Sequence, residues 1–226
     1  MFREWLHVFK EDAVMTKILA EYEAMIEDAR WMFHAIGQSL VGGEPPESFS
    51  EELLERDQRL NQAEKRIRKR IIEHLALNPA KDLGLCLVLF SGVKDAERLG
   101  DYCKNLQELS GHLRGYDLLP AYRPAIAAIF SQIEQLFSAT AKAFAESSRE
   151  KAREVMDALV PLKKECHRIV EEILENGNEL DTRAAVATAL TTRYFKRLAA
   201  HLSNIASGVI NPVHKIDYYL PNQKHE

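Results

Sequence analysis

The sequence contains few residues that interrupt helices and few that would suit an extracellular protein. It has only 10 glycines and 8 prolines in 226 residues, so long uninterrupted helices are compatible with it. Its three cysteines form no Cys-x-x-Cys pair and leave an odd number, which argues against a disulfide framework and a cysteine-based zinc site. A reducing compartment, the cytoplasm, fits this cysteine usage best.

Long apolar runs are also absent. The longest mainly apolar stretch, residues 83–93, is shorter than the roughly 18 residues that a membrane-spanning helix needs. The first twelve residues, MFREWLHVFKED, lack the basic leader and apolar core of a secretory signal. We therefore expect a soluble protein.

Neither charge sign dominates the composition. The 30 basic and 34 acidic residues give a formal charge of −4, so the chain as a whole has no electrostatic attraction to nucleic acid. With 46% hydrophobic residues, the chain can bury a sizeable core in one large domain or two small ones.

Apolar residues instead recur at spacings of three and four, the period of a helix with one buried stripe, and no segment reads as a strand. The pattern predicts a first helix over residues 13–40, ended by the Gly- and Pro-containing segment 42–48. A second helix is expected from about residue 50 to 75. Asn78-Pro79 predicts its end and the cap and first turn of a third helix, which runs to about residue 115.

The same rhythm returns after Pro120. Helices are expected through residues 126–144 and 155–173, and a last one follows an Asn-Gly-Asn break and ends near residue 208. The segment KDAERLGDYCKNL (94–106) also aligns with RYFKRLAAHLSNI (193–205), which indicates a duplication. The predicted fold is all-α, with two pseudo-repeated three-helix bundles of up-and-down helices. The expected divisions are a short N-terminal helix (1–12), a first bundle (13–117), a second, diverged bundle (118–210) and a C-terminal tail (211–226).

Candidate ligands stand in one row of the third predicted helix. Glu97, Asp101 and Asn105 are four residues apart and so share one helix face. Their oxygen atoms suit magnesium, manganese or iron. Such spacing is also common on solvated helices, where Lys94 and Lys104 would simply pair with the carboxylates.

Residues 80–106, AKDLGLCLVLFSGVKDAERLGDYCKNL, resemble the signature of the PhoU family, in which an apolar helix leads into a motif of the form ERxGDxxxN. Residues 53–67 resemble the second helix of that family, with Asp57 and Asn61 at its D-x-x-x-N positions. The resemblance extends from about residue 14 to 210 and implies two PhoU-type, spectrin-like bundles.

The resemblance also implies a function. PhoU-like proteins are non-enzymatic regulators that act with a phosphate transporter and a phosphate-sensing kinase to restrain phosphate uptake and starvation signalling. Their motif residues, here Glu97, Asp101, Asp57, Asn61 and Asn105, would bind iron, zinc, manganese or magnesium on the first bundle. Membrane association would then arise through partners, and a homodimer is compatible with the family.

The second half departs from this motif. Lys196 and Ala200 replace the two carboxylates, while Arg197 and Asn204 remain, so we expect no metal on that half. Asp157 is kept, but Pro161 stands at the position that matches Asn61 and predicts a kink or a helix start. His201 lies at a motif-adjacent position without nearby carboxylates in the sequence, so a structural role is expected.

Two further segments allow a functional and a structural interpretation. Phe2, Trp5, Leu6 and Phe9 would share one side of the N-terminal helix, which could meet a membrane or a partner, although packing on its own bundle or on a second subunit is favoured. The second predicted helix is locally basic, which suits an anionic partner or, more simply, a solvated charged face.

No catalytic motif is evident. The sequence lacks a GxSxG nucleophile elbow, a GxxxxGK[ST] phosphate loop and a dinucleotide fingerprint. Two alternatives to the phosphate regulator stay open: a metal-storage or di-metal carboxylate enzyme, and a PhoU-like regulator of another ion transporter. The first would need inward-facing Glu-x-x-His pairs, and none is evident.

Overall fold

The computed structural model describes residues 13–40, 49–79, 82–112, 118–176 and 180–218. Within these ranges the chain is helical and contains no strand. The N-terminal helix predicted over residues 1–12 and the tail beyond residue 218 lie outside them. The long helices are α2 (Ala13–Leu40), α3 (Phe49–Leu77), α4 (Leu83–His112), α5 (Arg123–Ala145), α6 (Arg149–Glu175) and α7 (Thr182–Ile210), with short 3-10 turns η1 (Pro120–Tyr122) and η3 (Val213–Lys215).

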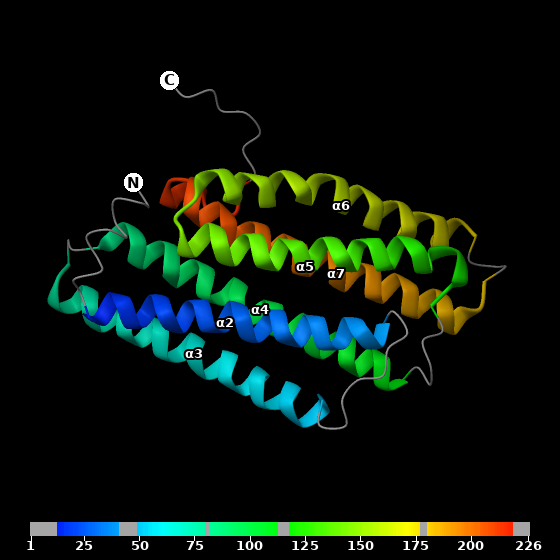
Figure 1. The fold of residues 1–226 in the computed structure, drawn as a ribbon, viewed down its shortest axis with the longest axis horizontal. Coiled ribbons are helices and arrows are strands. Elements are labelled where there is room, and N and C mark those ends of the chain that lie inside the picture. Colours follow the sequence, from blue (N-terminus) through cyan, green and yellow to red (C-terminus); the bar gives the residue numbers. More distant parts are fainter. Residues whose placement is uncertain (1–12, 41–48, 80–81, 113–117, 177–179, 219–226) are drawn as a thin grey trace, which may run out of the picture.

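These six helices run along the long axis of the molecule (Figure 1). Helices α2, α3 and α4 pack on one another, as do α5, α6 and α7. The two groups meet where α4 packs on α7 and α2 packs on α5. The predicted all-α fold of two three-helix bundles is thus confirmed, and none of the described helices is long and apolar enough to cross a bilayer.

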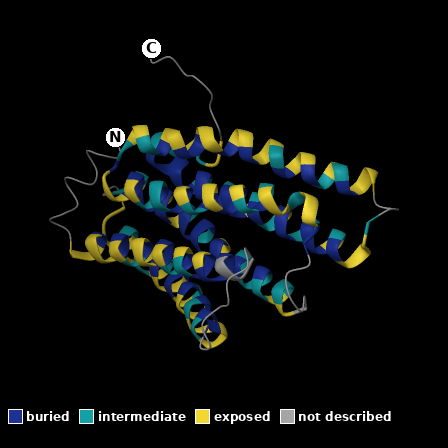
Figure 2. Ribbon diagram, turned by 45° about the vertical axis from the view of Figure 1, so that its right-hand side comes forward, coloured by how far each residue is buried: buried dark blue, intermediate teal, exposed yellow. Residues whose placement is uncertain are grey.

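Both groups contribute to one continuous core. The ring of Phe33 in α2 lies 4.9 and 5.5 Å, centroid to centroid, from Phe130 and Phe137 in α5, and 5.6 Å from Phe195 in α7. Figure 2 shows the buried residues turned inward and the exposed ones along the outer edges of the helices. Each such ring pair contributes about 0.5–1.5 kcal/mol beyond area burial, so the two halves stabilise each other.

Local side chains define the helix starts in the second half. The hydroxyl of Ser148 accepts a hydrogen bond from the backbone amide of Lys151, and the carboxylate of Asp181 accepts one from that of Ala184. Each interaction satisfies a backbone donor that the first helical turn would leave unpaired, which contributes about 1 kcal/mol.

The predicted start of the third helix was wrong by four residues. Pro79 lies in the turn after α3, and α4 begins at Leu83. The turn is held by Asp82, which adopts a left-handed backbone (φ 62°) and contacts His74 Nε2 through its Oδ2 at 2.9 Å. The two side chains are 5% and 3% exposed, so this buried pair sets the geometry that the proline was expected to set.

Of the two alternatives predicted at Pro161, a kink or a helix start, the helix start is wrong. Helix α6 begins twelve residues earlier and continues through Pro161. Proline carries no backbone N–H and so cannot donate to the carbonyl of Asp157. The apolar stripe on either side of it, which includes Met156, Leu159 and Leu162, is buried against the other helices, and this packing holds the two segments in one helix.

Candidate functional site

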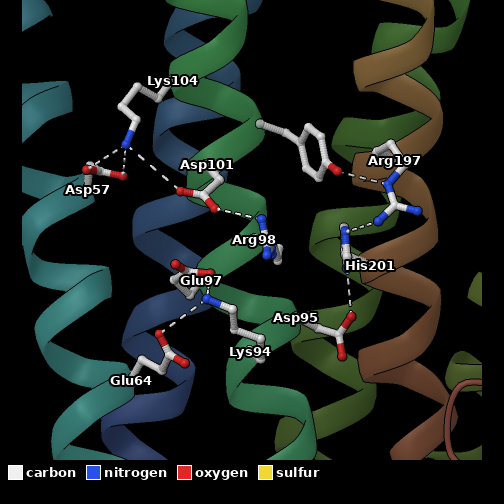
Figure 3. Close-up of polar contacts among 11 residues, drawn as sticks. Asp57, Glu64, Lys94, Asp95, Glu97, Arg98, Asp101, Lys104, Arg197 and His201 are labelled. Atoms are coloured by element: carbon white, nitrogen blue, oxygen red, sulfur yellow. Dashed lines mark hydrogen bonds and ion pairs between the residues drawn. The ribbon is translucent and has the colours of Figure 1, made fainter.

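Helices α3 and α4 bring the predicted carboxylates together across their interface. Asp57 of α3 faces Asp101 of α4, and Lys104 Nζ lies between them (Figure 3). The ammonium is 3.2 and 3.4 Å from the two carboxylate oxygens of Asp57 and 3.9 Å from Asp101 Oδ1. Arg98 also contacts Asp101, with Nη1 3.3 Å from Oδ2. One carboxylate from each helix thus shares one cation.

A second, similar arrangement lies further along the same interface. Lys94 Nζ is 2.7 Å from Glu97 Oε2 and 3.6 Å from Glu64 Oε2 on α3 (Figure 3). The Lys94–Glu97 contact falls outside hydrogen-bond angles and is therefore an ion pair only. Glu64 was missed from the sequence, although its position seven residues after Asp57 places it on the same helix face.

The carboxylates are less exposed than the row of surface ligands that the sequence suggested. Asp57 and Glu97 are 9% and 6% exposed, and only Asp101 is half-buried. A charged carboxylate taken out of water requires a cation or hydrogen-bond donors. Lys94 and Lys104, whose side chains are 40% and 30% exposed, supply that charge from the rim of the interface.

The two predicted amide ligands differ in their surroundings. Asn61 Nδ2 donates to the backbone carbonyl of Asp57 at 2.9 Å, which points the amide group along its own helix. Asn105 is half-buried one turn beyond Asp101 on α4. The structure therefore brings Asp57, Glu97 and Asp101 to one face and adds Glu64.

The donor set suits a hard cation in two respects. The side chains offer oxygen atoms, and each of the two carboxylate pairs already holds a positive group in the form of a lysine ammonium. In the described ranges, however, no three His, Cys, Asp or Glu side chains stand close enough to form a ligand set. A metal ion would have to take the place of Lys94 or Lys104 and draw the carboxylates inward.

His201 has a carboxylate beside it that the sequence did not indicate. Asp95 of α4 lies 2.7 Å from His201 Nδ1 through its Oδ1, and the same oxygen accepts a hydrogen bond from Asn204 Nδ2 at 2.9 Å. Asp95 and His201 are each 8% exposed. The two residues are 106 positions apart, so no sequence spacing could have indicated this contact.

Arg197 and Tyr102 complete this inter-bundle cluster. Arg197 Nε donates to the Tyr102 hydroxyl at 2.9 Å, and the Tyr102 ring stacks on the His201 ring with centroids 5.5 Å apart. Figure 3 shows Arg197 above His201, whose ring faces Asp95. The aligned segments 94–106 and 193–205 make Tyr102 and His201 equivalent positions. The two halves therefore meet through matching turns of α4 and α7.

The sequence profile of the PhoU domain matches residues 22–110 and again residues 126–209. The chain belongs to the PhoU family. The two matches cover both three-helix groups, so the PhoU-family assignment accounts for the duplication. No curated protein matches the sequence.

Solved PhoU structures share this fold. PhoU from Pseudomonas aeruginosa superposes with a TM-score of 0.77 at 21% identity, over 88% of this chain and 96% of that one. The phosphate transport system regulatory protein PhoU from Streptococcus pneumoniae gives a TM-score of 0.70 at 16% identity, over 93% of this chain and 95% of that one. At these identities the likeness establishes the architecture of the PhoU-family chain.

Proposed function

We propose that this protein regulates a phosphate transport system as a non-enzymatic adaptor in the cytoplasm. The observation that carries the proposal is the double PhoU-domain match together with a fold shared with a phosphate transport system regulatory protein over nearly the full length of both chains. Its partners would be the transporter and a phosphate-sensing kinase. A homodimer is compatible with this role.

The chemistry of the charged rows supports binding over turnover. Each buried carboxylate of the α3–α4 interface is matched by a nearby lysine, an arrangement that stabilises charge. A groove of about 650 Å³ lies between α2, α5 and α6. Three of its basic side chains contact carboxylates, namely Arg30 with Glu27, His34 with Glu134 and Lys151 with Glu146.

We further propose that the α3–α4 face exchanges its lysines for a metal ion. Asp57 with Asp101, and Glu64 with Glu97, would hold iron, zinc, manganese or magnesium, with Asn61 and Asn105 as additional oxygen donors. The bound ion would offer a concentrated positive charge to an anionic group of a partner. Because Lys196 and Ala200 replace the matching carboxylates, the second half would bind none.

Metal content tests that proposal. The double variant Glu97→Gln/Asp101→Asn should retain less than about a tenth of the wild-type metal per chain, measured by plasma mass spectrometry after dialysis. Glu108→Gln, an exposed carboxylate of the same helix, is the matched control and should retain the wild-type content. Equal metal in all three proteins would place the ion elsewhere.

Deletion of the gene tests the regulatory role. Loss of the protein should raise phosphate uptake and change expression of a phosphate-starvation reporter, and affinity purification from the native cells should recover transporter or kinase subunits. Unchanged uptake and reporter activity would refute the proposal. Recovery of a different transporter in the purification would favour a PhoU-like regulator of another ion. Catalytic turnover that depends on a metal ion bound between the helices would favour a di-metal enzyme.

A further inference from the structure

One end of the α3–α4 face is apolar and open to solvent. Helix α4 places Leu83, Leu87 and Phe90 on a single stripe, because spacings of four and three residues return to the same side of a helix. These side chains are 45%, 42% and 37% exposed, and Ile72 of α3, which is 59% exposed, joins them. Single exposed apolar residues are common on proteins, whereas a contiguous group marks a binding surface. These four residues are called the apolar patch below.

Two contacts across the interface define how α3 and α4 align beside the patch. Lys94 Nζ lies 3.6 Å from Glu64 Oε2, and one turn earlier in α4 the ring of Phe90 lies 5.1 Å from the guanidinium carbon of Arg68. The helices are therefore antiparallel, since a step of four back along α4 matches a step of four forward along α3. The next turn of α3 brings Ile72 level with the turn of α4 that precedes Phe90. The patch thus continues the face that carries the carboxylate rows, toward the end where α4 begins.

The outer edge of the patch on α3 is basic. Lys65 and Lys69 precede Ile72 by seven and three residues, which places both on its side of the helix, and both are exposed. Lys69 contacts Glu73 at 3.7 Å, but the two side chains are 76% and 60% exposed, and an ion pair in that setting contributes little. A molecule bound on the patch would therefore meet positive charge along this edge.

The shape and charges of the face favour a protein helix over a bilayer or a second copy of the chain. The patch side chains are about half covered by their own helices, so they do not project as anchors that enter a bilayer do. A bilayer would also have to cover Asp101, further along the same face, whose negative charge opposes anionic headgroups. A stable dimer buries about 800 Å² per partner, which is more than four half-exposed side chains present.

We propose that the apolar patch docks an amphipathic helix of a partner protein, with its apolar stripe toward the patch and acidic residues toward Lys65 and Lys69. Two turns of a helix match the stripe of α4, because Leu83 and Phe90 are seven residues, or about 10 Å, apart along the helix axis. The inference rests on the adaptor role proposed above and specifies the kind of segment that a partner would supply.

Two labelled model peptides are the probes that test the proposal. Each has about 15 residues, the length at which an isolated helix becomes marginally stable, and carries leucines at spacings of three and four. The peptides differ only beside the leucines, where one has glutamate and the other lysine. Because the whole chain has a formal charge of −4, its overall field favours the lysine peptide. Fluorescence anisotropy with the full chain should nevertheless show the glutamate peptide binding at least about fivefold more tightly.

Substitutions in the patch test the apolar contact. Leu87→Ser/Phe90→Ser should weaken binding of the glutamate peptide at least about tenfold. The matched control, Leu174→Ser/Val186→Ser, changes two exposed apolar residues of α6 and α7 and should alter binding by less than about twofold. Circular dichroism checks that each variant is helical. If the patch pair loses helicity, Ile72→Ser at the most exposed patch position decides, and it should weaken binding about threefold.

Charge reversal tests the basic edge. Lys65→Glu/Lys69→Glu leaves the apolar patch intact and should reverse the preference between the two peptides, because like charges would then face the glutamates. Added salt should reduce the difference between the peptides in the wild type, since screening acts on exposed charges.

Three results would overturn the proposal: no binding of the glutamate peptide to the wild type, equal weakening by the patch pair and its control, or an unchanged peptide preference after charge reversal. Patch-dependent binding to vesicles of equal parts phosphatidylcholine and phosphatidylglycerol would instead assign the patch to a membrane. A dimer that Leu87→Ser/Phe90→Ser dissociates in sedimentation velocity would assign it to a second copy. These outcomes are separable from the proposed function, because the uptake phenotype of the deletion does not depend on them.

Discussion

His201 of α7 donates its Nδ1 proton to Asp95 of α4 across 2.7 Å. The tautomer follows from Arg197, since a guanidinium has only donors and its Nη2, 3.4 Å from His201 Nε2, requires that nitrogen to accept. The imidazole of His201 is thereby oriented between Asp95 of the first half and Arg197 of the second. This contact joins the two bundles through buried polar groups.

Replacing Asp95 should therefore destabilise the inter-bundle contact. In Asp95→Ala, His201 Nδ1 and Asn204 Nδ2 lose their shared acceptor while they remain mostly buried, which should lower the free energy of unfolding by about 2–3 kcal/mol. Urea denaturation followed by circular dichroism measures the change. Glu108→Ala, at an exposed site of the same helix, should change it by less than about 0.5 kcal/mol. Equal values for the two variants would show that the Asp95 contact adds nothing to stability.

A methyl group at Gly37 should separate the two halves. A Cβ at this position would lie 1.7 Å from Cε2 of Phe130, whose ring is buried between α2 and α5, so one helix or the ring must move. Gly37→Ala should cost about 1–3 kcal/mol of unfolding free energy.

Gly111→Ala supplies the matched control for the methyl group. Nothing lies within 4 Å of a Cβ there, and alanine favours a helix, so the change should be neutral or stabilising by up to about 1 kcal/mol. Thermal unfolding of the two variants tests the pair. A Gly37→Ala protein as stable as the wild type would mean that α2 and α5 approach less closely than described.

Removing the proline from α6 should strengthen that helix. Pro161→Ala restores an N–H that can donate to the carbonyl of Asp157 and removes the clash of the ring, in an exposed position of a continuous helix. We expect a gain of about 1–3 kcal/mol in unfolding free energy, measured by urea titration. Val160→Ala, next to it and also exposed, should be nearly neutral. A loss of stability in Pro161→Ala would indicate that the native packing of α6 depends on the proline.

The cysteines should be unreactive in the folded protein. All three are buried, burial raises the pKa of Cys103 strongly, and burial, opposed in part by Lys196, raises the pKa of Cys166 to about 12. A raised thiol pKa disfavours the thiolate, so the reactive fraction of Cys166 at pH 8 should be about a thousandfold below that of an ordinary cysteine.

Titration with a thiol-specific disulfide reagent tests this expectation. The native protein should react slowly at pH 8, and the denatured chain should release three equivalents at once. Rapid reaction of one thiol before unfolding would reveal a local opening of its helix.

The sequence by itself determined the helices and their duplication. Apolar periodicity identified α2 and α5 closely, because a helix that must bury one stripe shows that stripe in its own residues. The same spacing placed Glu97 and Asp101 on one face of α4, and the PhoU resemblance selected Asp57 from α3. These inferences concern single helices or a recognised motif. They could be made without knowing how the helices pack on one another.

The tertiary structure alone decided which charges meet. Lys104 bridges Asp57 and Asp101, and Asp95 reaches His201, because neighbouring helices pack in a particular register that a periodic pattern leaves open. Burial of Asp57 and Glu97 has the same origin, since exposure depends on the helix packed opposite. At Pro161 the local preference predicted a kink or a helix start. No helix starts there, because α6 packs along its whole length and continues through the proline.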